Sequence, residues 1–286
     1  MHYVKAKGIF KSDYGINLYR GCTHGCIYCD SRSEIYQINH KFEDIEVKEN
    51  APELLKKELI RRKPFMVSTG AMTDPYIPIE KRIQHVRKCL ELIYRYGYGF
   101  SCLTKSDLIL RDLDLLKKIN EKTKAVVQIT INTTDDELCK IIEPNVCPAS
   151  RRLEVLRRLN ENDIPAVVWL SPILPYINDT EENINSILDC CIDENVKGVL
   201  NLDMGLSLRK GNREFFYGKL DENFPGLKDR YVEEFADSEF VHGKNDRKLK
   251  GILKRRCKKH GMLYKQDDIF EYVHEFPSKS VQSKLI

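Results

Sequence analysis

The sequence predicts an α/β protein in which short strands and amphipathic helices alternate around a parallel sheet. Apolar, β-branched runs of four to seven residues recur at intervals of about 25 to 50 residues, the spacing that βα units require. Segments with a helical period separate these runs. We expect six strands, at residues 16–19, 65–68, 99–103, 125–131, 166–170 and 198–202.

The segments between the strands carry the 3.6-residue period of helices that pack on a sheet. Two apolar stripes show it most clearly, namely Ile83, Val86, Leu90 and Ile93 in the first and Leu153, Leu156 and Leu159 in the second. Helix starts are indicated by a proline in the first turn or by a capping residue, at Pro52, Asp112 and Asp179-Thr180.

The alternation of strands and helices ends near Asp203. Beyond it, glycines interrupt an aromatic stretch at residues 215–217, which predicts a loop-rich connection to a helical C-terminal segment. We therefore expect a core domain in residues 1–205 and a smaller segment in residues 206–286.

Length and composition exclude several classes of protein. The chain has 286 residues, of which 42% are hydrophobic and 31% charged, with a mean hydropathy of -0.45, values that exclude a disordered chain. The longest aliphatic or aromatic run covers residues 166–170, whereas a membrane helix needs about 20. The first residues lack the apolar core of a signal peptide. We expect a soluble protein with no membrane partner in the reducing cytoplasm.

The charge balance is near neutral except in one tail segment. The formal net charge is +4, but residues 244–260 carry nine Lys and Arg residues against one acid, Asp246. Such a run suits contact with the phosphates of a nucleic acid. The alternative is a solvated helix, because Leu249, Ile252 and Leu253 form an apolar stripe within it.

Three of the ten cysteines, Cys22, Cys26 and Cys29, lie within eight residues, directly after the first predicted strand. The C-x3-C-x2-C spacing lets a loop wrap a cubane iron-sulfur cluster, with Gly21 and Gly25 allowing tight backbone curvature. Three cysteines on four irons leave one iron open for a further ligand. The alternatives are a zinc site completed by His24, and three buried thiols without a metal.

The motif, with an aromatic residue before its last cysteine, resembles that of the radical S-adenosylmethionine (SAM) superfamily. The resemblance implies a partial (β/α)6 TIM-type barrel whose mouth is capped by the C-terminal segment. It also implies a [4Fe-4S] cluster on Cys22, Cys26 and Cys29, SAM on the open iron, and Tyr28 near the adenine.

Within that superfamily the chain is most similar to the spore photoproduct lyase-like group, also called DNA repair photolyase-related proteins. Five further segments, most of them directly after a predicted strand, carry the similarity: 68–76, 103–106, 128–133, 143–144 with 151–153, and 171–173. Residues past the carboxyl ends of barrel strands face the open mouth. The resemblance assigns SAM contacts to Thr73, Asp74, Lys105, Thr130, Glu143, Arg152 and Ser171.

Among these residues, Lys105 is expected to neutralise the SAM carboxylate. Arg152 is expected to approach either the methionine of SAM or Glu143, the residue that supports it. Each residue also has an ordinary interpretation, because Glu143 and Arg152 suit a surface ion pair and Asp74 suits a turn.

Two positions depart from spore photoproduct lyase. Met72 stands where that enzyme has a hydrogen-donating cysteine, and a thioether has no S–H to give. Asp30 stands where it has a tyrosine. Both changes argue against spore photoproduct repair itself, while Cys102, Cys139 and Cys147 are alternative donors or inert buried thiols.

The resemblance implies an enzyme that cleaves SAM reductively and abstracts hydrogen from a substrate. A nucleic-acid base or lesion is the leading hypothesis, and a small molecule, peptide or protein is the alternative. A non-enzymatic metal-binding or redox-sensing protein is a third. We expect an electron donor such as flavodoxin or ferredoxin, while the sequence predicts neither the oligomeric state nor whether SAM is regenerated.

Overall fold

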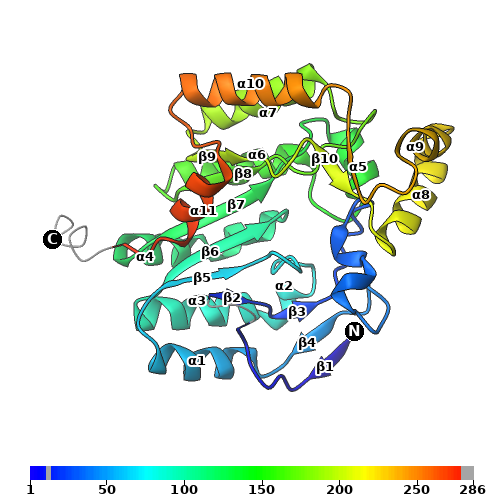
Figure 1. Cartoon of the computed structure of the whole chain (residues 1–286). Helices are drawn as coiled ribbons and strands as arrows, with labels where there is room; N and C mark the ends of the chain where they lie inside the picture. The colour runs from blue at the N-terminus through cyan, green and yellow to red at the C-terminus, as the bar shows by residue number, and fades with distance from the viewer. Residues whose placement is uncertain (11–13, 278–286) are drawn as a thin grey trace.

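The computed structural model describes residues 1–10 and 14–277, and its centre is a six-stranded, all-parallel sheet (Figure 1). The strand order β2-β5-β6-β7-β8-β9 follows the chain, as in a barrel that is left open. The six predicted strands are confirmed with small shifts, as β2 (Gly15–Ile16), β5 (Met66–Thr69), β6 (Gly99–Thr104), β7 (Ala125–Thr130), β8 (Ala166–Trp169) and β9 (Gly198–Leu200).

The first strand is shorter than the predicted range 16–19. The chain leaves the sheet after Ile16, because Lys48 donates hydrogen bonds to the carbonyls of Asn17 (2.8 Å) and Leu18 (3.2 Å). Beyond this turn the chain enters a second, three-stranded sheet. It comprises β1 (His2–Val4), β4 (Glu46–Lys48) and β3 (Tyr19–Arg20), in the order β1-β4-β3.

Helices connect the strands, and most of the longer ones cover the outer face of the barrel (Figure 1). They are α1 (Ala51–Arg61), α2 (Glu80–Ile83), α3 (His85–Tyr96), α4 (Leu113–Lys122), α5 (Asp136–Ile142), α6 (Ala149–Asn160) and α7 (Glu181–Asp193), with short 3-10 turns η1 (Asp30–Arg32), η2 (Glu34–Tyr36) and η3 (Asp107–Asp112). The stripe predicted to run from Ile83 to Ile93 is divided at Gln84, which takes a left-handed φ of 56° between α2 and α3. Val67, Val127 and Val168 pack with these helices in the main core.

The stretch after residue 203 is not loop-rich, contrary to our expectation. It forms β10 (Gly205–Ser207), α8 (Asn212–Asn223), α9 (Leu227–Phe235) and β11 (Phe240–His242). Strands β10 and β11 pair antiparallel, and the two helices form a hairpin at one side of the barrel (Figure 1). The expectation failed because Gly211 (φ 94°) and Gly226 (φ 78°) immediately precede helices instead of interrupting them.

The described remainder of the C-terminal segment, up to residue 277, does not cap the mouth. Helix α10 (Asp246–Lys259) packs on α7 outside the barrel, whereas α11 (Gln266–His274) packs against the inner face of the barrel sheet. Ile269 and Val273 of α11 are buried against Met66 and Val126, near the amino ends of β5 and β7. These strand residues face inward, where an open barrel has no opposite strands to cover them. The expected boundary near residue 205 stays a prediction.

The basic segment forms an amphipathic helix. Leu249, Ile252 and Leu253 of α10 are buried, as the solvated-helix interpretation predicted. Three of its basic residues pair with acids of neighbouring segments: Lys248 with Glu181, Lys250 with Asp203, and Arg256 with Asp189.

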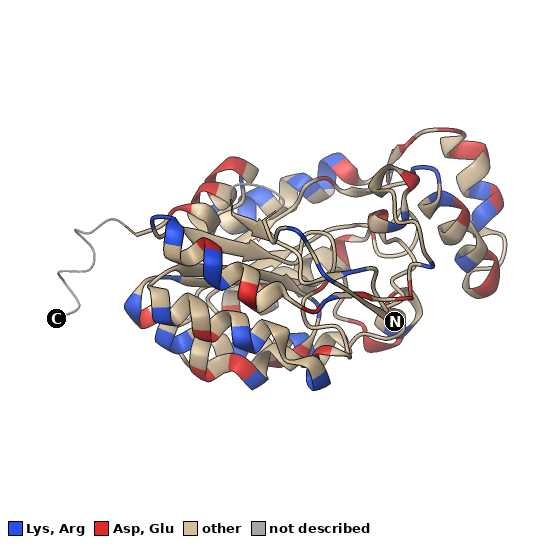
Figure 2. Ribbon diagram, turned by 90° about the horizontal axis from the view of Figure 1, so that it is seen from below, with Lys and Arg blue, Asp and Glu red and all other residues tan. Residues whose placement is uncertain are grey.

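Basic and acidic residues are interspersed along the helices of the barrel (Figure 2). Among the described residues, no helix is both long and apolar enough to cross a membrane.

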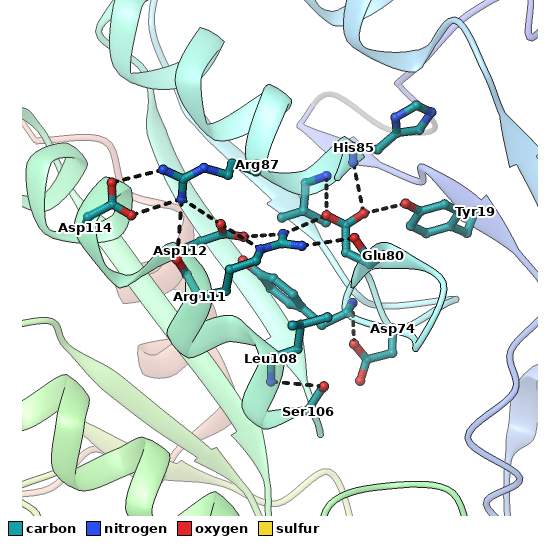
Figure 3. Close-up of polar contacts among 12 residues, drawn as sticks. Tyr19, Asp74, Glu80, His85, Arg87, Ser106, Leu108, Arg111, Asp112 and Asp114 are labelled. Carbon is teal, nitrogen blue, oxygen red and sulfur yellow. Dashed lines mark hydrogen bonds and ion pairs between the residues drawn. The ribbon is translucent and has the colours of Figure 1, made fainter. Parts of the chain in front are cut away.

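A buried ionic network joins the strand before the cysteines to the outer helices (Figure 3). The fully buried Glu80 carboxylate accepts hydrogen bonds from the Tyr19 hydroxyl (2.5 Å) and the His85 amide (3.0 Å). It also pairs with Arg111 at 2.8 Å, and Arg111 in turn pairs with the buried Asp112 at 2.6 Å. Tyr19 lies three residues before Cys22, so this network anchors the start of the cysteine loop.

We predict that Glu80→Ala lowers the free energy of unfolding by about 3–5 kcal/mol, because it removes one of the two carboxylates that pair with Arg111 and leaves the Tyr19 hydroxyl and the His85 amide without their buried acceptor. Asp114→Ala is the control, since that residue is 48% exposed in its pair with Arg87 and should cost less than about 1 kcal/mol. Anaerobic urea unfolding followed by circular dichroism measures both. Equal losses would contradict the structural role assigned to Glu80.

Candidate functional site

A hollow of about 1140 Å³, counted out to its open rim, lies at the carboxyl ends of the barrel strands. Eight of the eleven predicted site residues line it: Cys22, Cys26, Tyr28, Cys29, Asp74, Lys105, Thr130 and Ser171. They come from the segments after β3, β5, β6, β7 and β8. Thr73, Glu143 and Arg152 do not line it.

The cysteine loop is held by backbone contacts to distant segments. The Cys22 amide donates to the Phe42 carbonyl, and the Ile27 amide to the Ile142 carbonyl, both at 3.0 Å. Gly21 has a φ of 82°, and a Cβ there would lie 2.4 Å from the Phe42 oxygen, so a glycine is required at this close approach. These contacts turn all three cysteines toward the same hollow.

The three thiols are suited to a metal cluster. Burial raises the pKa of Cys22 to about 12, and burial raises the pKa of Cys26 well above its usual value. A cation must therefore bind them before they are thiolates at neutral pH. The Lys105 side chain opposes both shifts, and its ammonium lies 5.9 Å from the centre of the Tyr28 ring.

The predicted pair Glu143 and Arg152 lies behind Tyr28. The Glu143 carboxylate, which is fully buried, accepts hydrogen bonds from the Tyr28 hydroxyl and from Arg152. Burial alone would raise the pKa of Glu143, but Arg152 and Lys105 lower it below its usual value. Arg152 thus lies against Glu143, and its guanidinium also donates to the Thr130 carbonyl at 2.9 Å.

Asn132, which the sequence analysis did not single out as a site residue, completes the support of Tyr28. Its side-chain amide donates to the Tyr28 hydroxyl at 3.0 Å, and its backbone carbonyl accepts from Asn178 (2.8 Å) and Asn183 (2.9 Å). Asn132 lies two residues after β7, and this position at the carboxyl end of a barrel strand could have indicated a site residue.

The Asp74 carboxylate is saturated by protein donors. It accepts from the Thr104 hydroxyl and the Lys105 amide, each at 2.7 Å, and from the Tyr76 amide at 2.8 Å, and it pairs with His24 at 3.0 Å. These partners, His24 foremost, outweigh the opposing effect of burial and lower the pKa of Asp74 to about 2. Asp74 therefore joins three loops at the wall of the hollow.

Thr73 lies in a neighbouring hollow with Arg20, Lys48 and Met72. It was predicted to meet SAM because it follows the second strand of the barrel. Thr73 is buried, and the hollow that it lines is also bounded by residues of β3 and β4. Its contact with SAM stays a prediction.

Asp30 connects the cysteine loop to the C-terminal segment. Its carboxylate accepts from the Tyr36 hydroxyl and pairs with Arg209, each at 2.7 Å. Leu206 and Phe240 of strands β10 and β11 also line the hollow, and the sequence analysis missed them because it read this stretch as a connection.

The alternative hydrogen donors do not line the hollow. Cys102 and Cys139 are buried, and burial raises the pKa of Cys139 to about 11. Cys147 lies 3.2 Å from the Lys105 carbonyl, outside the lining. Met72 is part of the wall, as its place after β5 predicted.

The arrangement of three cysteines at the mouth of a parallel partial barrel defines a class of iron-sulfur enzymes. Residues 16–188 match the Radical SAM superfamily, so the chain belongs to this superfamily. Its members bind a [4Fe-4S] cluster and SAM and require an external reductant.

Similar proteins include an uncharacterized protein of Methanocaldococcus jannaschii, which is 39% identical over 170 residues, or 59% of this chain and 63% of that protein. An uncharacterized protein of Mycobacterium bovis is 29% identical over 242 residues, which cover 80% of this chain and 68% of the relative. The chain therefore spans about two thirds of the length of these relatives.

Among solved structures, spore photoproduct lyase in complex with dinucleoside spore photoproduct has a similar fold. Its TM-score is 0.66 at 15% identity, and the match covers 92% of this chain and 80% of that chain. A variant of the same enzyme with bound AdoMet and dinucleoside spore photoproduct has a TM-score of 0.60 at 15% identity, covering 86% of this chain and 74% of the other.

We predict that Arg152→Gln lowers the free energy of unfolding by about 3–5 kcal/mol and loosens the support of Tyr28, because the buried Glu143 carboxylate loses the cation that is hydrogen-bonded to it and keeps Lys105 as its compensating charge. The neighbouring Arg151→Gln is a matched control, since Arg151 is 52% exposed and should cost less than about 1 kcal/mol. Anaerobic unfolding and tyrosine fluorescence measure the two effects. Unchanged stability in Arg152→Gln would contradict a supporting role for the pair.

Proposed function

We propose that this chain is a radical SAM enzyme whose cluster is bound by Cys22, Cys26 and Cys29 and whose substrate enters the hollow beside them. The observation that carries the proposal is the convergence of these three thiols with Tyr28 and Lys105 on one cavity wall. When reduced, the cluster and SAM together supply a 5'-deoxyadenosyl radical, which abstracts hydrogen from a substrate.

The protein's own residues bind and orient the cofactor. The Lys105 ammonium neutralises the SAM carboxylate, and the Tyr28 ring packs near the adenine. Thr130 and Ser171 complete the contacts from the ends of β7 and β8, while Asp74 holds the Lys105 backbone in place.

Apolar side chains protect the reacting centre from water. Trp169, Leu206 and Phe240 line the hollow together with Met72. Their side chains offer no O–H or S–H hydrogen to a radical, and water exclusion prevents side reactions of reactive intermediates.

We further propose a nucleic-acid base or a base lesion as the substrate. Phe240 (43% exposed) and Leu202 (42% exposed) lie at the hollow, where exposed apolar side chains suit stacking against a base. The fold similarity to spore photoproduct lyase supports a lesion-type substrate, whereas Met72 argues against spore photoproduct itself. Flavodoxin or ferredoxin is the proposed electron donor. The alternative substrate is a small molecule, a peptide or a protein.

The cofactor assignment is tested by anaerobic reconstitution with iron and sulfide, followed by dithionite and SAM. We expect the wild type to form 5'-deoxyadenosine and Cys26→Ala to form none, as measured by chromatography. Lys105→Ala should keep its cluster but bind SAM about 10-fold or more weakly, because it loses a charge-assisted contact.

Lys140→Ala is the control for Lys105, since Lys140 is an exposed helix residue paired with Glu137. Bound zinc in place of iron, or SAM binding that is equal in Lys105→Ala and in the wild type, would overturn the assignment.

The substrate proposal is tested with single-stranded oligonucleotides by fluorescence anisotropy at several salt concentrations. We expect salt-dependent binding that Phe240→Ala weakens about 5-fold or more, as the loss of a stacking surface does. Val232→Ala is the control, because Val232 is 49% exposed on α9 and does not line the hollow. Binding that neither salt nor Phe240→Ala changes would favour the alternative substrates.

A further inference from the structure

Outside the hollow, His2, His40 and Glu46 bring three metal-binding side chains together. One ring nitrogen of each histidine and one carboxylate oxygen of Glu46 all lie within 4.8 Å of one another. His2 and Glu46 are register partners on the parallel strands β1 and β4, so their side chains share one face of the small sheet. The two imidazole rings meet edge to face with their centres 5.0 Å apart.

The second nitrogen of each histidine is already bonded. His40 Nδ1 lies 2.9 Å from the Lys41 carbonyl, and His2 Nδ1 lies 3.0 Å from the Asp44 carboxylate. A carbonyl can only accept a hydrogen bond, so His40 carries its proton on Nδ1 and presents a lone pair at Nε2. A backbone carbonyl and a carboxylate are the partners that orient metal-binding histidines in proteins.

The nitrogen that remains on His40 has no protein partner. His40 Nε2 is buried and makes no hydrogen bond to any described residue. The Glu46 carboxylate likewise has no hydrogen-bond or ion-pair partner within residues 1–10 and 14–277. Arg20, the register partner of Glu46 on β3, donates to the carbonyls of Tyr36 and Gln37 instead of pairing with Glu46. A cation bound between the His40 lone pair and the Glu46 carboxylate would satisfy both groups.

A second cluster of metal-binding types in the molecule provides a contrast. Asp203, His242 and Asp246 also come within 4.8 Å of one another. There, the Lys250 ammonium pairs with both aspartates. A protein cation thus pairs with that cluster, whereas no lysine or arginine within residues 1–10 and 14–277 forms an ion pair with His2, His40 or Glu46.

We propose that His2, His40 and Glu46 bind one divalent transition-metal ion of the zinc class. Two imidazoles and one carboxylate form a three-ligand set that zinc accepts, with water as the fourth ligand. Ligand atoms around tetrahedral zinc lie about 3.4 Å apart, so the three side chains close in slightly on binding.

The proposed ion braces the loop that supports the cysteines. A Cβ on Gly21 would lie 3.6 Å from His40 Cε1, and the Cys22 amide bonds to the Phe42 carbonyl at 3.0 Å. The ion therefore joins the first strand of the chain to residues 40–46, against which the cysteine loop packs. Its role is to stabilise this region, and it is separate from the cluster.

The test is calorimetric titration of the tag-free, cluster-loaded chain with zinc chloride under anaerobic conditions. We expect one zinc per chain with no loss of iron or sulfide. Zinc should bind more than about 100-fold more weakly to Glu46→Gln and to His40→Ala, and about 10-fold more weakly to Asp44→Asn, which loosens His2. Glu46→Gln keeps the size of its side chain, so it remains informative if His40→Ala does not fold.

His242→Ala is the control and should bind zinc as the wild type does. Zinc-edge X-ray absorption should show nitrogen and oxygen ligands at about 2.0–2.1 Å. Any of three results would overturn the proposal: no stoichiometric zinc, unchanged affinity in Glu46→Gln, or sulfur ligands, which would place the zinc on the cysteine loop.

Discussion

The carboxylate of Asp74 is the interaction on which the geometry of the hollow depends. It bonds to His24 in the cysteine loop and to Thr104 and Lys105 at the end of β6, while it also closes its own turn at Tyr76. The cysteine loop has almost no regular secondary structure, so its backbone polar groups must find partners elsewhere in the fold. Placement of the thiols therefore depends on segments far apart in the sequence.

This dependence explains which parts of the site could be predicted. The three cysteines are recognised by local spacing, and Lys105, Thr130 and Ser171 by their positions after apolar strands. The sequence shows that a residue follows a strand, but it does not show how deeply that residue's side chain is buried. Glu143 and Arg152 were therefore expected at SAM, although the structure buries them behind Tyr28.

The same limit applies to the fold. Continuous apolar strands indicate that both faces of the sheet are covered. The alternation of strands with segments of helical period predicts the helices on the outer face. The sequence pattern does not identify what covers the inner face of an open barrel. That cover is α11, whose Ile269 and Val273 pack on Met66 and Val126 only after the chain has formed the α8–α9 hairpin and returned along α10.

The two departures from spore photoproduct lyase lie on the same wall of the hollow. Asp30 and Met72 both line it, and Ser31, next to Asp30, donates a hydrogen bond to the Met72 carbonyl at 3.0 Å. Asp30 accepts from Tyr36 and pairs with Arg209 through one carboxylate, a charged contact that a tyrosine does not offer. The three cysteines line the same hollow as this wall, and it is at Asp30 and Met72 that the chain departs from the pattern expected of spore photoproduct lyase.

The residues of that wall limit which group can give hydrogen to a substrate radical at the end of the proposed reaction. Among the described residues that line the hollow, the three cluster cysteines are the only thiols. A substrate radical formed there therefore has no further cysteine of the wall from which to take hydrogen. The hydrogen that completes the proposed chemistry then comes from 5'-deoxyadenosine, from a tyrosine hydroxyl of the lining such as that of Tyr36, or from a donor that enters with the substrate. Only the first of these routes regenerates SAM.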